Sequence, residues 1–335
     1  MSKITFNEYL EIVRNPETDD NTILSLSIVE KGQGGFDYTI KPDPQKVELT
    51  PEDIAFENAF KIGNGLSRFR RQLRFRRRKL LGSKLPILVS EGDSWFQFPF
   101  LVREVIDQLE KKYLIWSVGA AGDTAENIVY GRAEYLEALH VQKDNVRGFL
   151  FSAAGNDIIG RDTKTGKSVL YDLLKDYNSD TQKIAGHINM DLLEEKLDFL
   201  KGAYRKVVDD IRAQPEFTKL PIFIHGYDYP FPYKWDESDH RKPRHAHKNQ
   251  WLGAPLDQRN YKNPQLRRDI IKFLIDQLYL MLEKVSGNPQ ETGVWLVDCR
   301  GAMPDVNDWI DEIHGNSEGF KKVAKRFIQV ISQAI

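Results

Sequence analysis

The sequence predicts an α/β fold, in which a parallel β-sheet is covered by helices on both faces. From residue 85 onward, apolar runs of strand length alternate with longer segments whose apolar residues recur at helical spacing. The predicted strands span residues 86–90, 113–118, 147–153, 221–225 and 294–298. The predicted helices span residues 99–111, 124–140, 192–213, 265–285 and 317–333. Such alternation is typical of a three-layer αβα sandwich with right-handed crossovers between parallel strands.

The first 84 residues do not follow this pattern and predict a mostly helical N-terminal extension. Residues 1–50 hold a short helix at 6–13 and a second apolar stretch at 23–26, and they form a module of unknown role. Residues 51–84 predict a basic amphipathic helix or linker. Its expected apolar face comprises Phe56, Phe60, Leu66, Phe69, Leu73 and Leu80.

The charge of this extension is concentrated in residues 61–84, which carry ten Lys and Arg residues and no acidic residue. The rest of the chain holds 38 basic and 49 acidic residues, so the net charge of −1 hides an asymmetry. A basic helix can bind an anionic membrane surface, a protein partner or, less expected here, nucleic acid. The alternative that we favour is packing against the acidic remainder of the same chain.

The composition limits the class of protein. A length of 335 residues, 41% hydrophobic and 29% charged, suits one large globular domain with an appendage, or two domains. No apolar run approaches the roughly 20 residues of a membrane-spanning helix, and the start lacks the apolar core of a secretory signal. The single cysteine, Cys299, cannot form an internal disulfide and is expected in or near the core. Together these features predict a cytoplasmic protein.

Four segments carry polar groups that could act together at one site. They are Gly92-Asp93-Ser94, Gly119-Ala120-Ala121-Gly122-Asp123-Thr124, Gly155-Asn156-Asp157 and Asp311-Glu312-Ile313-His314. The first three follow successive predicted strands, so they should meet at the carboxyl edge of the sheet, where α/β proteins keep their sites. Asp311 and His314 are three residues apart, so within one helical turn both side chains would face the same way. A carboxylate beside an imidazole fixes its tautomer and supports the imidazolium that forms during proton abstraction.

In this order and strand context, the four segments resemble the blocks of the SGNH (GDSL-type) hydrolase family. The resemblance covers about residues 85–335 and implies a flavodoxin-like αβα sandwich with a five-stranded parallel sheet. It implies Ser94 as the nucleophile, His314 as general base and then acid, and Asp311 as the group that orients His314. It also implies an oxyanion hole made by the backbone N–H groups of Ser94 and Gly122 and the side-chain amide of Asn156.

The function implied by this resemblance is hydrolysis of carboxylic esters through an acyl-enzyme, without a cofactor. The basic helix and an aromatic loop favour a lipid or lysophospholipid ester as the substrate, and deacetylation of a carbohydrate is the alternative. From a different class, the chain could be a binding or scaffold protein whose arginine-rich helix engages nucleic acid or a partner.

Two long connections, residues 160–190 and 227–264, are insertions that we interpret as lids or binding loops. The second is rich in aromatic residues, and the predicted substrate contacts are Trp95, Tyr227, Tyr229 and Trp235. The same insertion contains His240, His245 and His247, with Asp236 and Asp239 nearby. Their spacing fits no firm zinc pattern, so no metal site is predicted. His225, at the end of the fourth strand, is interpreted as structural.

Overall fold

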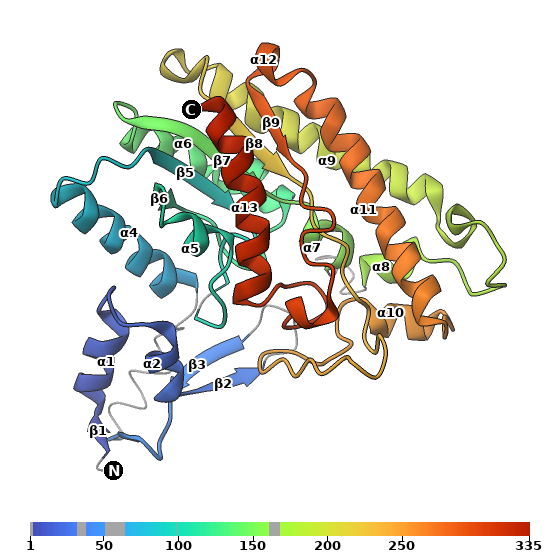
Figure 1. Cartoon of the computed structure of the whole chain (residues 1–335), viewed down its shortest axis with the longest axis horizontal. Helices are drawn as coiled ribbons and strands as arrows, with labels where there is room; N and C mark the ends of the chain where they lie inside the picture. Colours follow the sequence, from blue (N-terminus) through green and yellow to red (C-terminus); the bar gives the residue numbers. More distant parts are fainter. Residues whose placement is uncertain (1–2, 32–37, 51–63, 99, 161–167) are drawn as a thin grey trace.

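A computed structural model describes residues 3–31, 38–50, 64–98, 100–160 and 168–335 (Figure 1). Its centre is a five-stranded sheet in the order β6-β5-β7-β8-β9, and every neighbouring pair is parallel. The strands are β5 (Ile87–Gly92), β6 (Leu114–Ser117), β7 (Val146–Ser152), β8 (Ile222–His225) and β9 (Val294–Val297). The predicted α/β class and all five predicted strands are therefore confirmed.

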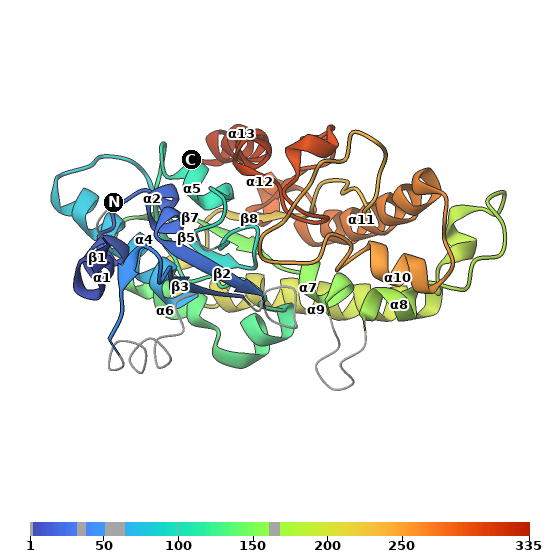
Figure 2. The same cartoon turned by 90° about the horizontal axis from the view of Figure 1, so that it is seen from below.

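The strands read as continuous apolar runs because helices cover both faces of the sheet. Helices α5 (Val105–Leu109) and α13 (Ser317–Ala334) lie on one face, and α6 (Glu134–Val141) and α9 (Met190–Arg212) lie on the other (Figures 1 and 2). Helix α11 (Pro264–Ser286) packs against α9 and the edge strand β9. Shorter helical segments are α7 (Gly155–Ile159), α8 (Val169–Leu173), η2 (Ile184–His187), η3 (Pro215–Phe217), α10 (Gly253–Gln258), α12 (Pro289–Thr292) and η4 (Val306–Asp308).

Two predicted helices are shorter or broken. The helix expected over 99–111 forms only as α5, because Phe100 has a φ of 62° and Glu104 caps the helix by accepting from the Ile106 N–H. The helix expected over 124–140 is divided at Ala133, whose φ is 47°. A π-helical turn, η1 (Asn127–Arg132), precedes this residue and α6 follows it.

The N-terminal extension is less helical than predicted. It contains α1 (Phe6–Arg14) and α2 (Asp20–Ser25), but also the antiparallel pair β2 (Ser27–Lys31) and β3 (Tyr38–Pro42) and the short parallel pair β1 (Ile4–Thr5) and β4 (Val47–Glu48). These elements bury their own apolar cluster, and Phe100 of the main domain inserts into it. The prediction of a mostly helical extension missed these strands: β1 and β4 are only two residues long, and β2 and β3 flank a glycine-rich stretch.

Helix α4 (Asn64–Leu80) buries arginines in place of the expected apolar face. Phe69 and Leu80 are exposed, whereas the Arg70 and Arg71 side chains are almost fully buried. Arg71 pairs with Glu104 and with Asp107, and other arginines of the helix pair with further acidic residues of the main domain. This arrangement supports the alternative in which the helix neutralises its own protein. Phe56 and Phe60, like the start of the predicted helix, lie outside the described residues.

The insertions are packed segments with a core of their own. Residues from 169 to 188 and from 246 to 261 bury an apolar cluster together with parts of α9 and α11. The part of the first insertion at 161–167 lies outside the described residues. No helix in the described ranges is both long enough and apolar enough to span a membrane.

Candidate active site

Ser94 lies in the turn that follows β5, and its neighbour Asp93 fixes this turn. One Asp93 carboxylate oxygen accepts from the Trp95 N–H at 3.0 Å and from the Ser152 hydroxyl at 2.8 Å. The hydroxyl of Tyr227 donates to the other oxygen. The groups that hold Asp93 come from the ends of β7 and β8 as well as from the turn after β5. The position of Ser94 is therefore set by tertiary contacts and not by the turn alone.

The second segment lies directly against the first. The Ala120 N–H donates to the Gly92 carbonyl at 2.9 Å. A Cβ on Gly119 would stand 2.5 Å from that same carbonyl oxygen, so only glycine permits this approach. Gly122 has a φ of 88°, a backbone conformation that favours glycine.

The third segment is joined to the second by its polar side chains. Asn156 donates through Nδ2 to the Asp123 carbonyl at 2.7 Å, and Asp157 accepts from the Ala125 N–H at 3.0 Å. Ala154, just before this segment, has a φ of 91°, a strained conformation that surrounding contacts must hold. The three segments thus form one connected edge, as their positions after successive strands predicted.

The fourth segment completes a chain of three hydrogen-bonded groups. His314 Nε2 lies 2.8 Å from Ser94 Oγ, and His314 Nδ1 lies 2.7 Å from Asp311 Oδ2. All three side chains are buried, with Ser94 only 4% exposed. Since Asp311 can only accept, His314 carries its proton on Nδ1 and presents the Nε2 lone pair to the serine hydroxyl.

Asp311 and His314 face each other through a capped turn, not through the helical turn that the spacing suggested. Asp311 Oδ1 accepts from the N–H groups of Ile313 and His314, both at 2.7 Å. A bridge between Trp309 and Gly315 closes this turn. An Asp side chain that bonds its own backbone two and three residues on competes with helix formation, which explains the difference.

The charge of Asp311 is strongly stabilised. Burial by itself would raise the pKa of this carboxyl, but the neighbouring His314 and hydrogen bonds from His245 and His314 outweigh it and hold the pKa well below its usual range. Asp311 therefore remains ionised at any pH at which the protein would work, and it can support a positive charge on His314.

Aromatic side chains enclose the imidazole of His314. The Phe98 ring stacks on it with a centroid distance of 4.3 Å, and the Trp251 ring meets it edge-on at 5.7 Å. Trp95 donates from its indole N–H to the Ile313 carbonyl at 3.0 Å, which ties the serine turn to the histidine turn.

A cavity of about 70 Å³ opens beside Ser94, Asn156 and His314. Its walls are mostly apolar and come from α7, α9, α11 and the turn before α13. The apolar lining residues include Ile158, Ile159, Leu193, Leu197, Leu252, Ile271, Leu274, Ile275, Leu278 and Ile313.

The predicted substrate contacts divide into two pairs. Trp95 and Tyr227 line the cavity, although their polar atoms already bond within the protein. Tyr229 and Trp235 are not among the lining residues: Tyr229 donates to Asp276, and Trp235 packs on Phe231. These two aromatic side chains stabilise the insertion, so the structure does not support them as substrate contacts.

The backbone of Gly122 is not among the cavity-lining residues either, whereas Ser94 and Asn156 are. The role of the Gly122 backbone N–H as an oxyanion donor stays a prediction. His225 is buried against Trp95 and Phe96 and does not line the cavity, and Cys299 is buried in the core. Both placements agree with the structural roles expected for these residues.

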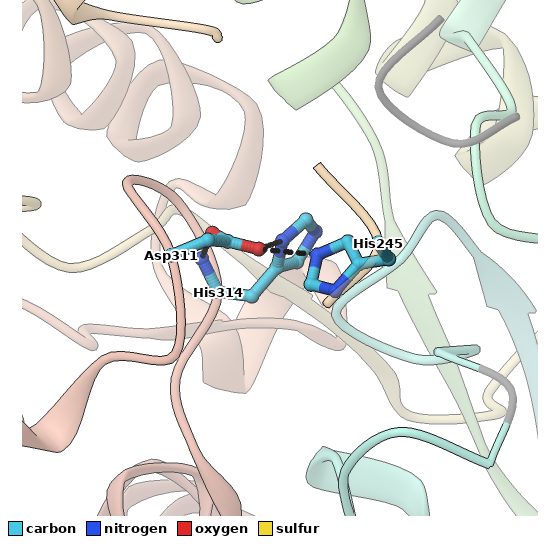
Figure 3. A group of neighbouring side chains, drawn as sticks. All are labelled: His245, Asp311 and His314. Carbon is cyan, nitrogen blue, oxygen red and sulfur yellow. Dashed lines mark hydrogen bonds and ion pairs between the residues drawn. The ribbon is translucent and has the colours of Figure 1, made fainter. Parts of the chain in front are cut away.

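Sequence reasoning missed the part played by His245. Its Nε2 lies 2.9 Å from Asp311 Oδ2, the same carboxylate oxygen that His314 Nδ1 contacts (Figure 3). His240 and His247, from the same run, are exposed. In the described parts of the chain, the group that could hold a metal ion is His245, Asp311 and His314.

Glu91 is a buried acid directly before the serine turn, and we expect it to make stability depend on pH. Burial raises the pKa of Glu91 to about 8, with a smaller opposing effect from Arg68. A carboxyl that ionises at higher pH when folded stabilises the fold below its ordinary pKa, and this contribution is lost as the pH rises through about 8.

Glu91→Gln should therefore flatten the decline in stability between pH 5 and pH 9. A shift of one pKa unit corresponds to about 1.4 kcal/mol. The pH-dependent loss in the free energy of unfolding of wild type, relative to Glu91→Gln, should therefore reach roughly 3–5 kcal/mol at pH 9. Thermal and urea unfolding of both proteins at several pH values measures this. Parallel pH profiles for the two proteins would show that Glu91 does not titrate in this window.

Solved structures similar to this chain share little of its sequence. No protein-family model matches the chain. One similar structure, from Streptococcus pneumonia and provisionally described as a platelet activating factor, has 11% identity and a TM-score of 0.41 over 84% of this chain and 100% of its own.

Two further structures are provisionally described as an SGNH hydrolase from Slackia heliotrinireducens and an arylesterase from Agrobacterium tumefaciens. The first has 8% identity, a TM-score of 0.40 and coverage of 74% of this chain. The second has 11% identity, a TM-score of 0.40 and coverage of 75% of this chain, and both are covered over 100% of their own length. Because the identities and TM-scores are this low, the function is inferred from the geometry of the site.

Proposed function

We propose that this protein is a serine hydrolase that cleaves carboxylic esters through an acyl-enzyme. The observation that carries this proposal is the continuous chain from Ser94 Oγ to His314 to Asp311, next to an apolar cavity. A serine hydroxyl is a poor nucleophile without an adjacent base, and here the base lies within hydrogen-bond distance.

The reaction would proceed in two halves. His314 Nε2 takes the hydroxyl proton as Ser94 Oγ attacks the ester carbonyl, and the ionised Asp311 stabilises the resulting imidazolium. His314 then gives that proton to the leaving alcohol, which leaves the acyl group on Ser94. In the second half, His314 activates a water molecule that releases the carboxylic acid and restores the serine.

Asn156 is the side chain best placed to stabilise the oxyanion. It lines the cavity with Ser94, and its bond to the Asp123 carbonyl fixes the orientation of the amide. One Nδ2 hydrogen makes that bond, and the amide carries a second hydrogen that can point into the cavity. Donors fixed in this way act mainly on the transition state.

Asn156→Ala should lower kcat by about 10²–10³-fold with little change in KM, as for the loss of one oxyanion donor. Steady-state kinetics on an activated ester measures both constants. The matched control is Asn127→Ala, in which an exposed asparagine beyond the glycine turn is replaced. If the effect fell on KM alone, Asn156 would bind the ground state and would not be an oxyanion donor.

The cavity favours a short acyl group as part of the substrate. Its apolar walls suit hydrocarbon, but its volume of about 70 Å³ is roughly half that of a cavity known to hold benzene, which is about 150 Å³. This supports acetyl to butyryl esters over the fatty acyl chain of a lipid or lysophospholipid. Carbohydrate O-acetyl esters fit the same limit.

A panel of esters with acyl chains of two to sixteen carbons tests this proposal, and kcat/KM should fall steeply beyond about four carbons. Leu197→Trp, which enlarges a half-buried lining side chain on α9, should move the preference toward acetate. Leu280→Trp, at an exposed position on α11, should leave the preference unchanged. A rate that rises toward long chains would contradict the short-acyl proposal and would favour a lipid ester.

The reading as a binding or scaffold protein predicts a different outcome. In that case no ester in the panel would be hydrolysed, and Ser94 would not react with an electrophile. Partners for the basic helix, whether an anionic membrane surface, a protein or nucleic acid, stay a prediction, and the inward pairing of Arg70 and Arg71 leaves less free charge for them.

A further inference from the structure

His245 extends the hydrogen-bonded chain by a fourth member. It comes from the 227–264 insertion, 66 residues before Asp311 in sequence, yet the two side chains are 2.9 Å apart. Asp311 Oδ2 thus lies between two imidazoles, with His314 Nδ1 at 2.7 Å (Figure 3). His245 is 1% exposed and His314 is 0% exposed, so water does not separate or screen these groups.

The protons on these groups follow from the distances. Asp311 accepts two backbone N–H groups on Oδ1 and two imidazole nitrogens on Oδ2, which matches the four acceptor sites of a carboxylate. Each imidazole nitrogen that faces Oδ2 must carry a hydrogen, because otherwise two lone pairs would face each other. His245 is therefore protonated on Nε2, and His314 is protonated on Nδ1.

This arrangement of protons favours a hydrogen-bonded cluster over a metal site. A metal ion would need lone pairs from both imidazoles and would need ligand distances near 2.0–2.1 Å around a common centre. The observed contacts of 2.7 and 2.9 Å join each nitrogen directly to the carboxylate oxygen. The geometry fits hydrogen bonds.

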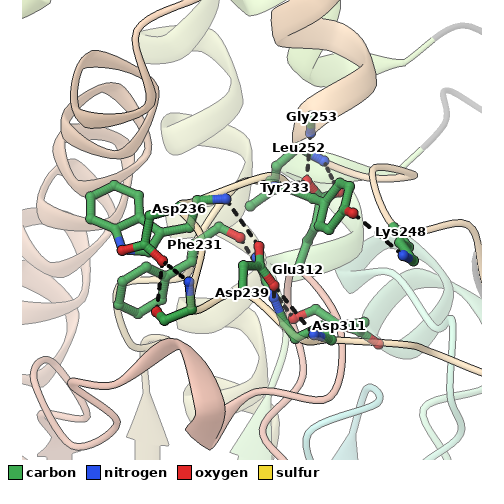
Figure 4. A network of polar contacts seen from close by, with 12 residues as sticks. Phe231, Tyr233, Asp236, Asp239, Lys248, Leu252, Gly253, Asp311 and Glu312 are labelled. Atoms are coloured by element: carbon green, nitrogen blue, oxygen red, sulfur yellow. Dashed lines mark hydrogen bonds and ion pairs between the residues drawn. The ribbon is translucent and has the colours of Figure 1, made fainter.

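The insertion is held so that His245 keeps this position. Glu312, adjacent to Asp311, accepts from four backbone N–H groups of the insertion, those of Tyr233, Trp251, Leu252 and Gly253, at 2.6–2.9 Å (Figure 4). Arg241 pairs with Asp239 and donates to the carbonyl oxygens of Phe231 and Asp311. The turn that carries Asp311 and the loop that carries His245 are therefore fixed to each other on both sides.

We propose that His245 is a positioning residue of the hydrolytic site. Its hydrogen bond keeps the Asp311 carboxylate oriented toward His314 and weakens the attraction of that carboxylate for the His314 proton. This inference rests on the proposed function. The hydrogen bond from His245 to Asp311 Oδ2 partly offsets the negative charge that Asp311 presents to His314. Without that donor, Asp311 loses one fixed contact and becomes a stronger acceptor toward His314, which then holds its proton more tightly.

Other charged groups near the cluster bear on how this is measured. They are Asp93, which lines the cavity and precedes Ser94 in the chain, Glu312 beside Asp311, and Arg241 with Asp239 in the insertion. Burial raises the pKa of Glu312 to about 7, so Glu312 can itself titrate in the working range. Because it is present in every variant, only the difference between two pH profiles reports on His245.

Two substitutions separate hydrogen bonding from packing. His245→Gln keeps an N–H donor, and His245→Leu keeps bulk without a donor. In His245→Leu, kcat should fall on the order of tenfold, because a buried acceptor on Asp311 loses its donor. The acid limb of the pH profile, where kcat/KM rises with pH, should also move to higher pH. His245→Gln should stay within about threefold of wild type with its acid limb unmoved, and His247→Gln, at the exposed histidine two residues away, should match wild type.

If the Leu and Gln variants behaved alike, with no difference in their acid limbs, His245 would only fill space and the proposal would be wrong. Should His245→Leu fail to fold, ¹⁵N NMR of the histidine rings in wild type decides the question. Protonation of His245 at Nε2 is expected there, and a bare Nε2 would overturn the proposal. The NMR result does not depend on hydrolysis, so it also separates a failure of this inference from an absence of esterase activity.

Discussion

Replacing Ser94 with alanine is expected to abolish ester hydrolysis, with a loss in kcat of about 10⁵–10⁶-fold. The substitution removes the attacking oxygen and leaves His314 without its partner at 2.8 Å. Any remaining rate would come from binding and oxyanion stabilisation alone. The measurement is hydrolysis of a short-chain activated ester at saturating concentration.

The control for this experiment is Ser90→Ala. Ser90 is buried in β5, four residues before Ser94, and does not line the cavity. Both variants should unfold at nearly the wild-type temperature, because a single hydroxyl contributes little to the core. An Ser94→Ala protein that remained folded and fully active would remove Ser94 from the nucleophile role.

Asp311→Asn has the second-largest expected effect, a fall in kcat of about 10⁴-fold with KM nearly unchanged. An amide at this position would turn N–H groups toward two imidazole nitrogens that themselves carry hydrogens. To avoid this contact His314 must change tautomer, which places a proton on the nitrogen that should accept from Ser94.

The kinetic test for Asp311→Asn compares it with Asp236→Asn, an exposed position in the insertion. Only the first should lose activity, and its remaining activity should rise at alkaline pH, where a nucleophile forms without the histidine base. A loss confined to KM would show that Asp311 shapes the substrate site and does not set the tautomer of His314.

Much of the site could be predicted because short segments at strand ends are brought together by the sheet itself. Ser94 and Asn156 follow β5 and β7, which are hydrogen-bonded neighbours, so reading the strands correctly was enough to place them together. Asp311 and His314 are close in sequence, and they meet even though the turn between them is not helical.

His245 could not be found in this way. Three histidines occur within eight residues of the insertion, and the local sequence does not distinguish the buried one from the two exposed ones. The contact with Asp311 depends on the hydrogen bonds by which Glu312 and Arg241 join the insertion to the turn. Such a position depends on tertiary contacts that no periodicity or motif records.

The face that α4 buries was misjudged for a related reason. Periodicity assigns apolar side chains to the core, but Arg70 and Arg71 find carbonyl oxygens and carboxylates there that satisfy them. Buried charges are tolerated when they are paired and hydrogen-bonded, and these partners come from α1, the chain after it and the turn before α5. Phe69 is correspondingly left half exposed.

Labelling with a fluorophosphonate tests most directly whether the buried hydroxyl at the end of β5 is an activated nucleophile. We expect one equivalent to attach to the wild-type protein, with the mass increment on the peptide that contains Ser94 and no labelling after His314→Ala. A folded wild-type protein that takes up no label, or labelling at another serine, would contradict the proposed hydrolytic site.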